Sequence, residues 1–388
     1  MAAGLASASA GDTVLLSPGT YFESVTLPVG VTLRGADPGQ ASVLDAAGAP
    51  RVLTSVSGNA FSRVEGVTLR GGAAGGGPGG GVRVQGGSLA LTDVRIESCQ
   101  AAFGGGLSLE NSAHVTWTRG ALSGCSATYG GGIFANGGAL SLTQVALGGN
   151  SAQTGGAIYA QGVSPVTLIS CGLSNNQSST DGGALAFLQS GVSLSDCKLD
   201  GNTASGHGGA VWAGPGTDAV CGYSVFSNNQ ALAGGAAYAT CDGPAGAGCA
   251  KVHLAHDDLV HNFAANSGAA AADGASLVEA EACVIAFNGG AIACLDPRAT
   301  IDIACTLLHG NGPDPGSGCA GTVSDTTSAD PLLCNVAGGD LERCAGSPAL
   351  TPAACGAPFL GAQGEGCSAC GFTRAQSITW GGLKGRYR

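Results

Sequence analysis

Three of the six histidines lie within nine residues, in the stretch KVHLAHDDLVHN at 251–262. If the stretch is an alternating strand, its apolar residues face inward and four polar side chains face outward. These four are His253, His256, Asp258 and His261. Neighbouring imidazoles could bind a divalent metal, which makes His253, His256 and His261 candidate ligands. Imidazole and carboxylate could also exchange protons near neutral pH, which makes His256, Asp258 and His261 candidate catalytic groups.

The preceding segment ATCDGPAGAGCAK interrupts an otherwise regular spacing of motifs. This extended turn could form one wall of a groove beside the histidines. The alternative is a solvated polar face beside an insert that a Cys241–Cys249 disulfide closes. We favour the polar face and therefore expect no cofactor, with a divalent metal as the alternative.

Three short triplets, TDG at 180–182, GHG at 206–208 and HDD at 256–258, resemble the catalytic signatures of polygalacturonases. Their order differs from that of the family, in which the aspartate pair precedes GHG. TDGG and GHGG are also two copies of a glycine turn that recurs along the chain. We therefore interpret TDGG and GHGG as turns and do not assign the chain to the polygalacturonases.

The composition excludes several classes of protein. Glycine supplies 70 of the 388 residues and 44% of the chain is hydrophobic, while only 11% is charged. These values separate the chain from collagen, flexible linkers and charged disorder. The net charge is −11 and no basic stripe precedes the last fifteen residues, so we expect no nucleic-acid partner. No apolar run is long enough for a transmembrane segment.

A repeat runs through most of the chain. Its first signal is a glycine pair followed by an apolar strand, as in GGGLSL, GGGIFA, GGAIYA and GGALAF. Its second signal is an apolar residue followed three positions later by Asn or Cys. The residues at this second position are Cys99, Cys125, Asn150, Asn176, Asn202, Asn229, Asn262, Asn288 and Asn311. We expect the asparagines to stack inward as a structural ladder rather than to bind a ligand.

Each repeat carries about three short alternating strands separated by turns rich in Gly, Asn and Ser. One such unit cannot bury its own apolar face, whereas coiling unit upon unit buries a continuous core. The sequence therefore predicts an all-β fold, a right-handed parallel β-helix of about eleven coils.

The cysteines fall into groups. Cys99 and Cys125 occupy equivalent positions in adjacent coils, as do Cys171 and Cys197, so each pair is either disulfide-bonded or buried as small apolar groups. Six more lie where the repeat is lost, from Cys319 to Cys370. CSAC at 367–370 is either half a zinc site or part of a disulfide-stapled cap over the last coil, and we favour the cap.

The GGA-apolar and FxxN motifs, seen in GGAIYA at 155–160 and FSNN at 226–229, resemble the repeats of chlamydial polymorphic outer-membrane proteins. The opening GDTVLLSPGTYFESVTL is similar to the first coils of pectin-lyase-like β-helix proteins. Both resemblances imply the β-helix fold, which hosts lyases, hydrolases, esterases, adhesins and proteins without known activity.

We expect a β-helix at 1–312, a Cys-rich capping region at 313–370 and a basic tail at 371–388 that is a sorting or anchoring peptide or a disordered end. The many cysteines favour an extracellular or bacterial cell-surface location, with a leader upstream of Met1. We expect a monomeric, non-enzymatic protein that binds polysaccharide or another surface in an adhesin-like or structural role. The alternative is a polysaccharide lyase or glycoside hydrolase that works in a groove of the β-helix.

Overall fold

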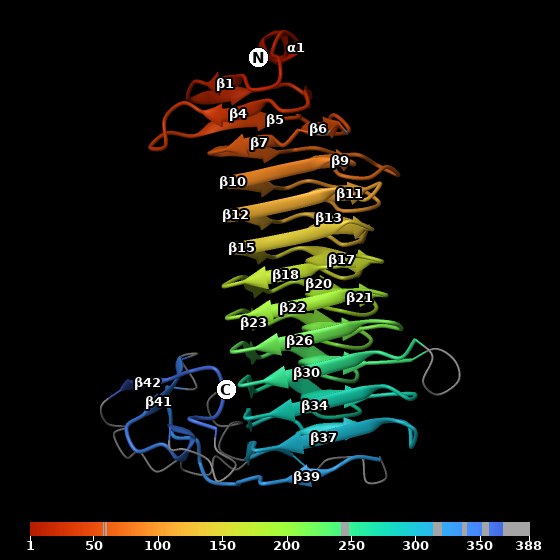
Figure 1. The fold of residues 1–388 in the computed structure, drawn as a ribbon, viewed down its shortest axis with the longest axis vertical. Coiled ribbons are helices and arrows are strands. Elements are labelled where there is room, and N and C mark those ends of the chain that lie inside the picture. The colour runs from red at the N-terminus through yellow and green to blue at the C-terminus, as the bar shows by residue number, and fades with distance from the viewer. Residues whose placement is uncertain are drawn as a thin grey trace, which may run out of the picture.

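The computed structural model describes residues 1–56, 58, 60–241, 248–312, 320–335, 340–350 and 357–367. These residues form a long stack of coils in which equivalent strands lie parallel, one above the other (Figure 1). The predicted all-β parallel β-helix is confirmed. No helix in the described part of the chain is long and apolar enough to span a membrane.

Sheet B contributes one strand to each of eleven successive coils. Its strands are β3 (Val25–Leu27), β6 (Leu53–Val56), β9 (Val82–Gln85), β11 (Leu107–Glu110), β14 (Ile133–Asn136), β17 (Ile158–Gln161), β21 (Leu185–Leu188), β25 (Val211–Ala213), β29 (Ala237–Ala239), β33 (Ala270–Ala272) and β36 (Ile292–Cys294). The adjoining sheet C is shorter and has six strands. These are β13 (Ser126–Tyr129), β16 (Ser151–Thr154), β20 (Gln177–Ser178), β24 (Thr203–Ala204), β28 (Gln230–Ala231) and β32 (Phe263–Ala264).

Sheet A has 22 strands and bends at a corner into two faces. The front face, which faces the viewer in Figure 1, contains β1 (Thr13–Leu16), β4 (Thr32–Gly35), β7 (Ser62–Glu65), β18 (Val166–Ile169), β22 (Gly191–Ser195), β26 (Asp218–Gly222), β30 (Lys251–Ala255), β34 (Leu277–Glu281), β37 (Thr300–Ala304) and β39 (Val323–Ser324). The side face contains β2 (Gly19–Tyr21), β5 (Ser42–Asp45), β8 (Val67–Arg70), β19 (Gly172–Ser174), β23 (Lys198–Asp200), β27 (Val225–Ser227), β31 (Asp258–Val260), β35 (Val284–Ala286) and β38 (Leu307–His309). Three long strands cross both faces, namely β10 (Ser88–Glu97), β12 (His114–Ser123) and β15 (Ala139–Gly148).

The core is a set of inward columns in which like positions of successive coils stack. In one front-face column, Trp117 pairs with Leu142 and Leu142 pairs with Leu168, and all three are at most 1% exposed. Burying each such side chain contributes about 1.5–3 kcal/mol. At the N-terminal end, the short helix α1 (Ala2–Ala6) inserts the buried Leu5 into the same core.

The asparagine ladder runs inside this stack as predicted. The Asn176 side-chain oxygen accepts hydrogen bonds from both the backbone N–H and the side-chain amide of Asn150, each at 3.0 Å. The Asn176 amide donates in turn to the oxygen of Asn202 and to the Leu147 carbonyl, also at 3.0 Å. The same pattern continues from Asn202 through Asn229, Asn262 and Asn288 to Asn311. Each amide therefore satisfies a backbone group at a corner that the sheets leave unpaired.

The residue before each ladder position turns the chain. Asn175 and Asn228 have φ values of 54° and 55°, and Gly149 and Gly201 have 63° and 66°. Because asparagine and glycine tolerate this left-handed conformation better than other residues, the motif SNN or GN marks a corner followed by an inward amide.

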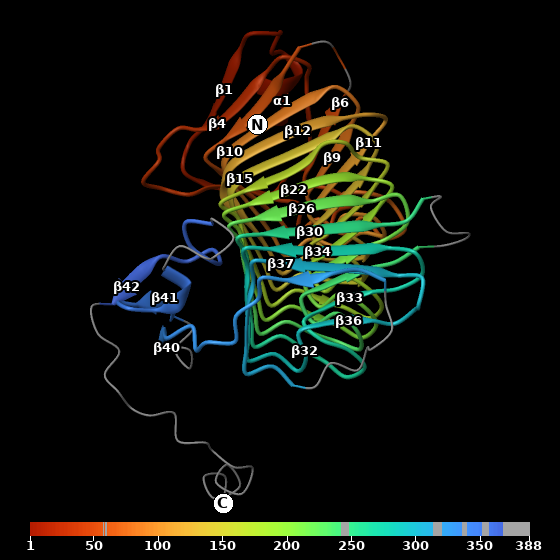
Figure 2. The same cartoon turned by 60° about the horizontal axis from the view of Figure 1, so that its bottom comes forward.

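The C-terminal segment, in its described residues from Leu333 onward, lies beside the stack (Figure 2). It forms a three-stranded sheet of β40 (Leu333–Asn335), β41 (Asp340–Cys344) and β42 (Glu365–Cys367), with the short 3-10 helix η2 (Pro348–Leu350) following β41. Residues 320–328 instead continue the stack, because Val323 pairs with Ile303 and Thr327 forms a bridge with Leu307. The Cys-rich C-terminal region is therefore present, and its described residues from Leu333 onward cover the side face.

The cysteines resolve the alternatives that the sequence left open. Disulfides join Cys241 to Cys249 and Cys334 to Cys367. Cys99, Cys125, Cys171 and Cys197 are free and buried, so these stacked pairs are small interior groups rather than disulfides. Cys319, Cys355, Cys370 and the tail at 371–388 lie outside the described residues.

The ladder predicts a specific loss of stability for Asn202→Ala. The substitution leaves the buried Asn176 N–H without its acceptor, and one such unsatisfied group costs about 1–3 kcal/mol. We expect a lower urea midpoint than for the exposed Gln177→Ala in the preceding coil, which should change the free energy of unfolding by at most about 0.5 kcal/mol. Equal midpoints for the two variants would show that the ladder does not stabilise the stack.

Candidate functional site

The four predicted site residues are distributed around one coil rather than gathered together. His253 is on β30 of the front face, and His256 occupies the corner that follows. Asp258 begins β31 on the side face, and His261 occupies the next corner. Within the described ranges, the groups of three or more potential ligand atoms that lie within 4.8 Å of one another include none of the three histidines. The geometry therefore does not support the metal site that was the alternative interpretation of these histidines.

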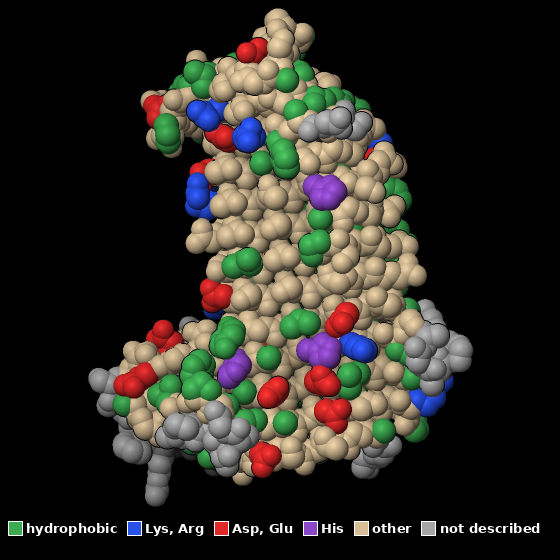
Figure 3. All heavy atoms as spheres, viewed as in Figure 1, with side chains coloured by type: hydrophobic (Ala, Val, Ile, Leu, Met, Phe, Trp, Pro, Cys, Tyr) green, Lys and Arg blue, Asp and Glu red, His purple; other side chains and the backbone are tan. Residues whose placement is uncertain are grey.

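His253 is held between two carboxylates on the front face. Its Nε2 lies 3.3 Å from Asp218 of β26, and its Nδ1 bonds to Glu279 of β34. Figure 3 shows acidic side chains gathered around a histidine and a basic residue in the lower part of this face. Each ring nitrogen of His253 therefore has a carboxylate of an adjacent coil as its neighbour.

The other two histidines pack against aromatic rings at their corners. His256, at φ 57°, stacks on Tyr223 with ring centroids 4.9 Å apart, and it also contacts Phe359 of the C-terminal segment at 5.6 Å. His261, at φ 58°, meets Phe287 edge-on at 5.7 Å. Both histidines therefore pack against aromatic rings at these turns, and the buried Nδ1 of His256 has no hydrogen-bond partner among the described residues.

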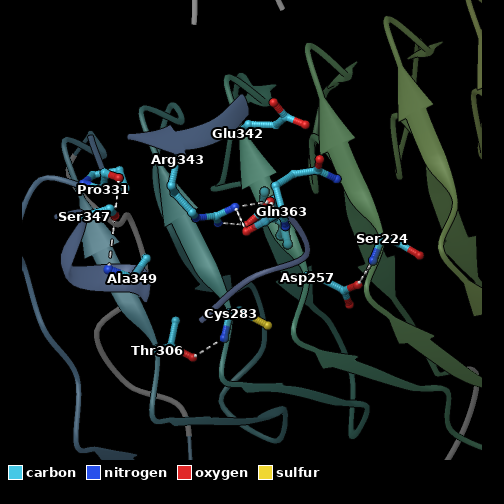
Figure 4. A network of polar contacts seen from close by, with 12 residues as sticks. Ser224, Asp257, Cys283, Thr306, Pro331, Glu342, Arg343, Ser347, Ala349 and Gln363 are labelled. Carbon is cyan, nitrogen blue, oxygen red and sulfur yellow. Dashed lines mark hydrogen bonds and ion pairs between the residues drawn. The ribbon is translucent and has the colours of Figure 1, made fainter. Parts of the chain in front are cut away.

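Asp258 points outward, as predicted, but it is covered and 1% exposed. Arg343 of β41 reaches it from the C-terminal segment through both terminal nitrogens, and is itself 0% exposed (Figure 4). Gln363 completes the contact, because its N–H donates to Asp258 at 3.1 Å and its carbonyl accepts from Arg343 at 2.6 Å. Burial raises the pKa of Asp258, and the neighbouring guanidinium opposes that rise. Asp258 therefore attaches the C-terminal segment instead of serving a surface site.

Apolar contacts surround this ion pair. Leu341 packs against Val225 and Val260, and Leu360 packs in a cluster with Val284 and Leu307. The repeat contains a signal for this cover that the sequence interpretation missed. Equivalent outward positions read Arg95, Ala121, Ala146, Gly172 and Lys198, and then change to Val225, Asp258, Val284 and Leu307.

The C-terminal segment does not offer a thiolate metal site in its described part. Cys334, Cys344 and Cys367 bring their sulfur atoms close together. Cys334 and Cys367 are joined by a disulfide, which leaves neither as a thiolate ligand.

The structure does bring together two residues that the sequence interpretation treated as turns. Asp181 and His207 precede the glycine pairs of successive coils. The Asp181 Oδ1 accepts from the His207 backbone N–H at 2.9 Å and lies 2.8 Å from His207 Nδ1. The carboxylate thereby orients the ring and leaves Nε2 as the nitrogen available for proton transfer.

Tyr238 of the next coil lies under the His207 ring, with centroids 4.5 Å apart. Its hydroxyl donates to Asp273 at 2.9 Å, and Trp212 packs beside it. Burial and the Asp273 carboxylate raise the pKa of Tyr238, so its phenol remains protonated at neutral pH. A chain of three contacts therefore lies on the outer side of sheet B. Hydrogen bonds join Asp181 to His207 and Tyr238 to Asp273, and ring stacking joins His207 to Tyr238.

Four aromatic rings continue this surface towards the N-terminal coils. Phe103 stacks on Tyr129 at 5.8 Å, and Phe134 stacks on Tyr159 at 5.8 Å. The two pairs also touch each other, because Phe103 lies 5.1 Å from Phe134 and Tyr129 lies 5.2 Å from Tyr159. We call this surface the aromatic tract, and its members are Phe103, Tyr129, Phe134, Tyr159, His207, Trp212 and Tyr238.

The tract consists of two columns. One column holds the residue before each glycine pair, and the other holds the outward residue of each sheet B strand. In the second column, β-pairing places Phe134, Tyr159, Ala186, Trp212 and Tyr238 in order along the stack. Ala186 interrupts the rings. The signal was present in GGGIFA, GGAIYA and GGAVWA, where an aromatic residue repeatedly follows the first large apolar position.

Comparisons with known proteins assign no family to the chain. No protein-family model matches the chain, and no curated protein matches its sequence. Among solved structures, the chain is similar to alginate lyase from Paenibacillus sp. str. FPU-7, at 12% identity and a TM-score of 0.39, over 84% of this chain and 96% of the lyase. It is also similar to the A-module of mannuronan C-5 epimerase AlgE6 from Azotobacter vinelandii, at 14% identity and a TM-score of 0.42, over 85% of this chain and 93% of the module.

The buried ion pair predicts that Arg343→Met releases the C-terminal segment. The substitution leaves the Asp258 carboxylate buried and unpaired, at a cost of about 3–5 kcal/mol. We expect limited proteolysis to cut the segment faster than in the wild type. Arg298→Met is the matched control, because Arg298 pairs with Asp296 but its side chain is 55% exposed. The double variant Asp258→Leu/Arg343→Met should recover resistance, and cleavage as fast as in the single variant would contradict this account.

Proposed function

We propose that the protein is an exported or cell-surface β-helix protein that binds polysaccharide through the aromatic tract and does not catalyse a reaction. The observation that carries this proposal is the stacking of rings in register over successive coils. Tyr159 and Tyr238 are buried, and the other rings are half-buried, so the accessible parts of Phe103, Tyr129, Phe134 and Trp212 offer the apolar area against which the C–H face of a sugar ring can lie. The coils repeat at about 4.8 Å, so the surface has the repetitive character that suits a repetitive polymer.

The location is supported by the disulfides. Cys241–Cys249 and Cys334–Cys367 are bonds of the kind that persist in oxidising compartments. The Cys241–Cys249 bond closes the insert at 241–249, and the Cys334–Cys367 bond staples the segment that covers the side face. Both therefore support a protein that works outside the reducing cytosol.

The alternative function is a polysaccharide lyase or glycoside hydrolase, and one observation favours it. Asp181 orients His207 as a carboxylate orients a general base, and Tyr238 and Asp273 lie beside this pair. In this alternative His207 replaces His256, Asp258 and His261 as the residue that carries the chemistry. The surface around His207 also belongs to the tract, so the same polymer would reach it.

The binding proposal predicts that Tyr129→Ala/Phe134→Ala weakens retention in affinity electrophoresis through polysaccharide gels. Two stacking contacts are worth about 0.5–1.5 kcal/mol each, which corresponds to a loss of affinity of roughly fivefold to 150-fold. The matched control is Val220→Ala, which removes an apolar side chain that is 46% exposed on the front face. Unchanged retention of a folded double variant would contradict the proposal.

The enzymatic alternative is tested by incubating the protein with pectins, alginate and glucans and measuring reducing sugar and unsaturated products. Our proposal predicts no turnover by the wild type. Turnover that His207→Ala abolishes and that the exposed His114→Ala preserves would establish the alternative and overturn the non-enzymatic proposal.

A further inference from the structure

A strip of uncharged polar side chains runs beside the aromatic tract. It is the outward column of sheet C, in which β-pairing stacks equivalent residues coil upon coil. Its first five members are Ser126, Ser151, Gln177, Thr203 and Gln230, and the exposed Phe263 of β32 follows them in the same column. Ser151, Gln177 and Gln230 are exposed, and Ser126 and Thr203 are half-buried. Hydroxyl and amide groups both donate and accept hydrogen bonds, so the strip can bond to sugar hydroxyls in either sense.

The tract and this strip contain no cation in the described segments. Neither lysine nor arginine occurs in 98–110, 124–136, 149–161, 175–188, 201–213, 228–241 or 261–273. The nearest cations in sheet B lie at its N-terminal margin and are already engaged. Arg83 pairs with Glu110 at 2.7 Å, and Arg51 donates to the carbonyls of Gly79 and Pro78.

The charges that this surface does carry are negative. Asp181 and Asp273 lie at the His207 end of the tract, in a chain whose net charge is −11. A polymer with one carboxylate per sugar would meet these groups without a compensating cation, and like charges at close range repel. The described cations of sheet A lie on the other faces. They include Arg63, Arg95, Arg119, Lys198 and Lys251.

We propose that the ligand is a neutral, hydroxyl-rich polysaccharide that lies along the axis of the stack. This inference rests on the proposed binding function and names its ligand class. The sugar rings lie on the half-buried rings Phe103, Tyr129, Phe134 and Trp212, which the two columns place on several coils. The sugar hydroxyls on one edge of the polymer bond to the sheet C strip. Acidic polysaccharides such as polyuronates are excluded from this surface by charge.

The test is affinity electrophoresis in gels that contain either neutral polymers (β-glucan, mannan or xylan) or acidic ones (alginate or polygalacturonate), at low and at moderate salt. We expect at least one neutral polymer to retain the wild type with an affinity roughly tenfold or more above that for either acidic polymer. That retention should be insensitive to salt, because the contacts are uncharged. It should also be lost in Tyr129→Ala/Phe134→Ala.

A second variant tests the charge argument directly. Gln177→Lys places a cation in the strip at an exposed position, and we expect it to create salt-sensitive retention by alginate. Val220→Lys, on the front face, is the matched control. We expect it to leave retention by alginate as it is in the wild type.

The outcomes separate the two proposals. Retention by acidic polymers alone that depends on Tyr129 and Phe134 would overturn the neutral ligand and keep the binding function. Salt-sensitive retention that the double variant does not change would place binding on another face and overturn both proposals. No retention in any gel would also overturn both.

Discussion

The parallel hydrogen bonding of each coil to the next fixes the position of every functional surface in this protein. Sheets can slip by a residue unless something specifies their register. Here the buried asparagine ladder specifies it, because each amide bonds to the amide and backbone of the adjacent coil and no shifted register satisfies those groups. The ladder also holds the corner that separates sheet C from the side face of sheet A. The same register aligns the outward side chains of successive coils, both the polar column of sheet C and the aromatic columns of the tract.

The faces that result have different surroundings. The side face changes from small or charged outward residues to apolar ones, and the C-terminal segment covers the apolar part and is fixed there by Arg343 and Asp258. The front face is open but acidic around His253. Sheet B and sheet C are uncovered in the described coils that carry the tract, and they combine aromatic rings with uncharged polar side chains. This distribution is why we place binding there.

Much of the fold could be predicted from the sequence because the same pattern of apolar, glycine and asparagine residues recurs in successive coils. The ladder asparagines, the corners and the inward apolar positions could all be predicted from nine copies of one motif. The histidine site could not, because KVHLAHDDLVHN was interpreted as one outward-facing rung. His256 and His261 instead adopt left-handed φ values at two corners, so a short stretch of chain points its side chains in several directions.

Other features depend on information outside a single repeat. Arg343 lies in a segment without periodicity, 85 residues from Asp258, so no spacing in the sequence connects them. The pairing of Asp181 with His207 was within reach, since both precede a glycine pair and such residues stack in successive coils. Treating the glycine turn as scaffold alone concealed that pair and the aromatic column beside it. A repeat is therefore informative twice, through the positions that stay constant and through the outward positions that vary.

The central claim is that the outer surface of sheets B and C binds a neutral polysaccharide. Hydroxyl-radical footprinting with and without a soluble neutral polymer that retains the protein tests it most directly. The account predicts reduced labelling of Phe103, Tyr129, Phe134 and Trp212, with unchanged labelling of Val220 and Tyr223 on the front side of the stack. Protection of Val220 and Tyr223 with no change at the tract would contradict it.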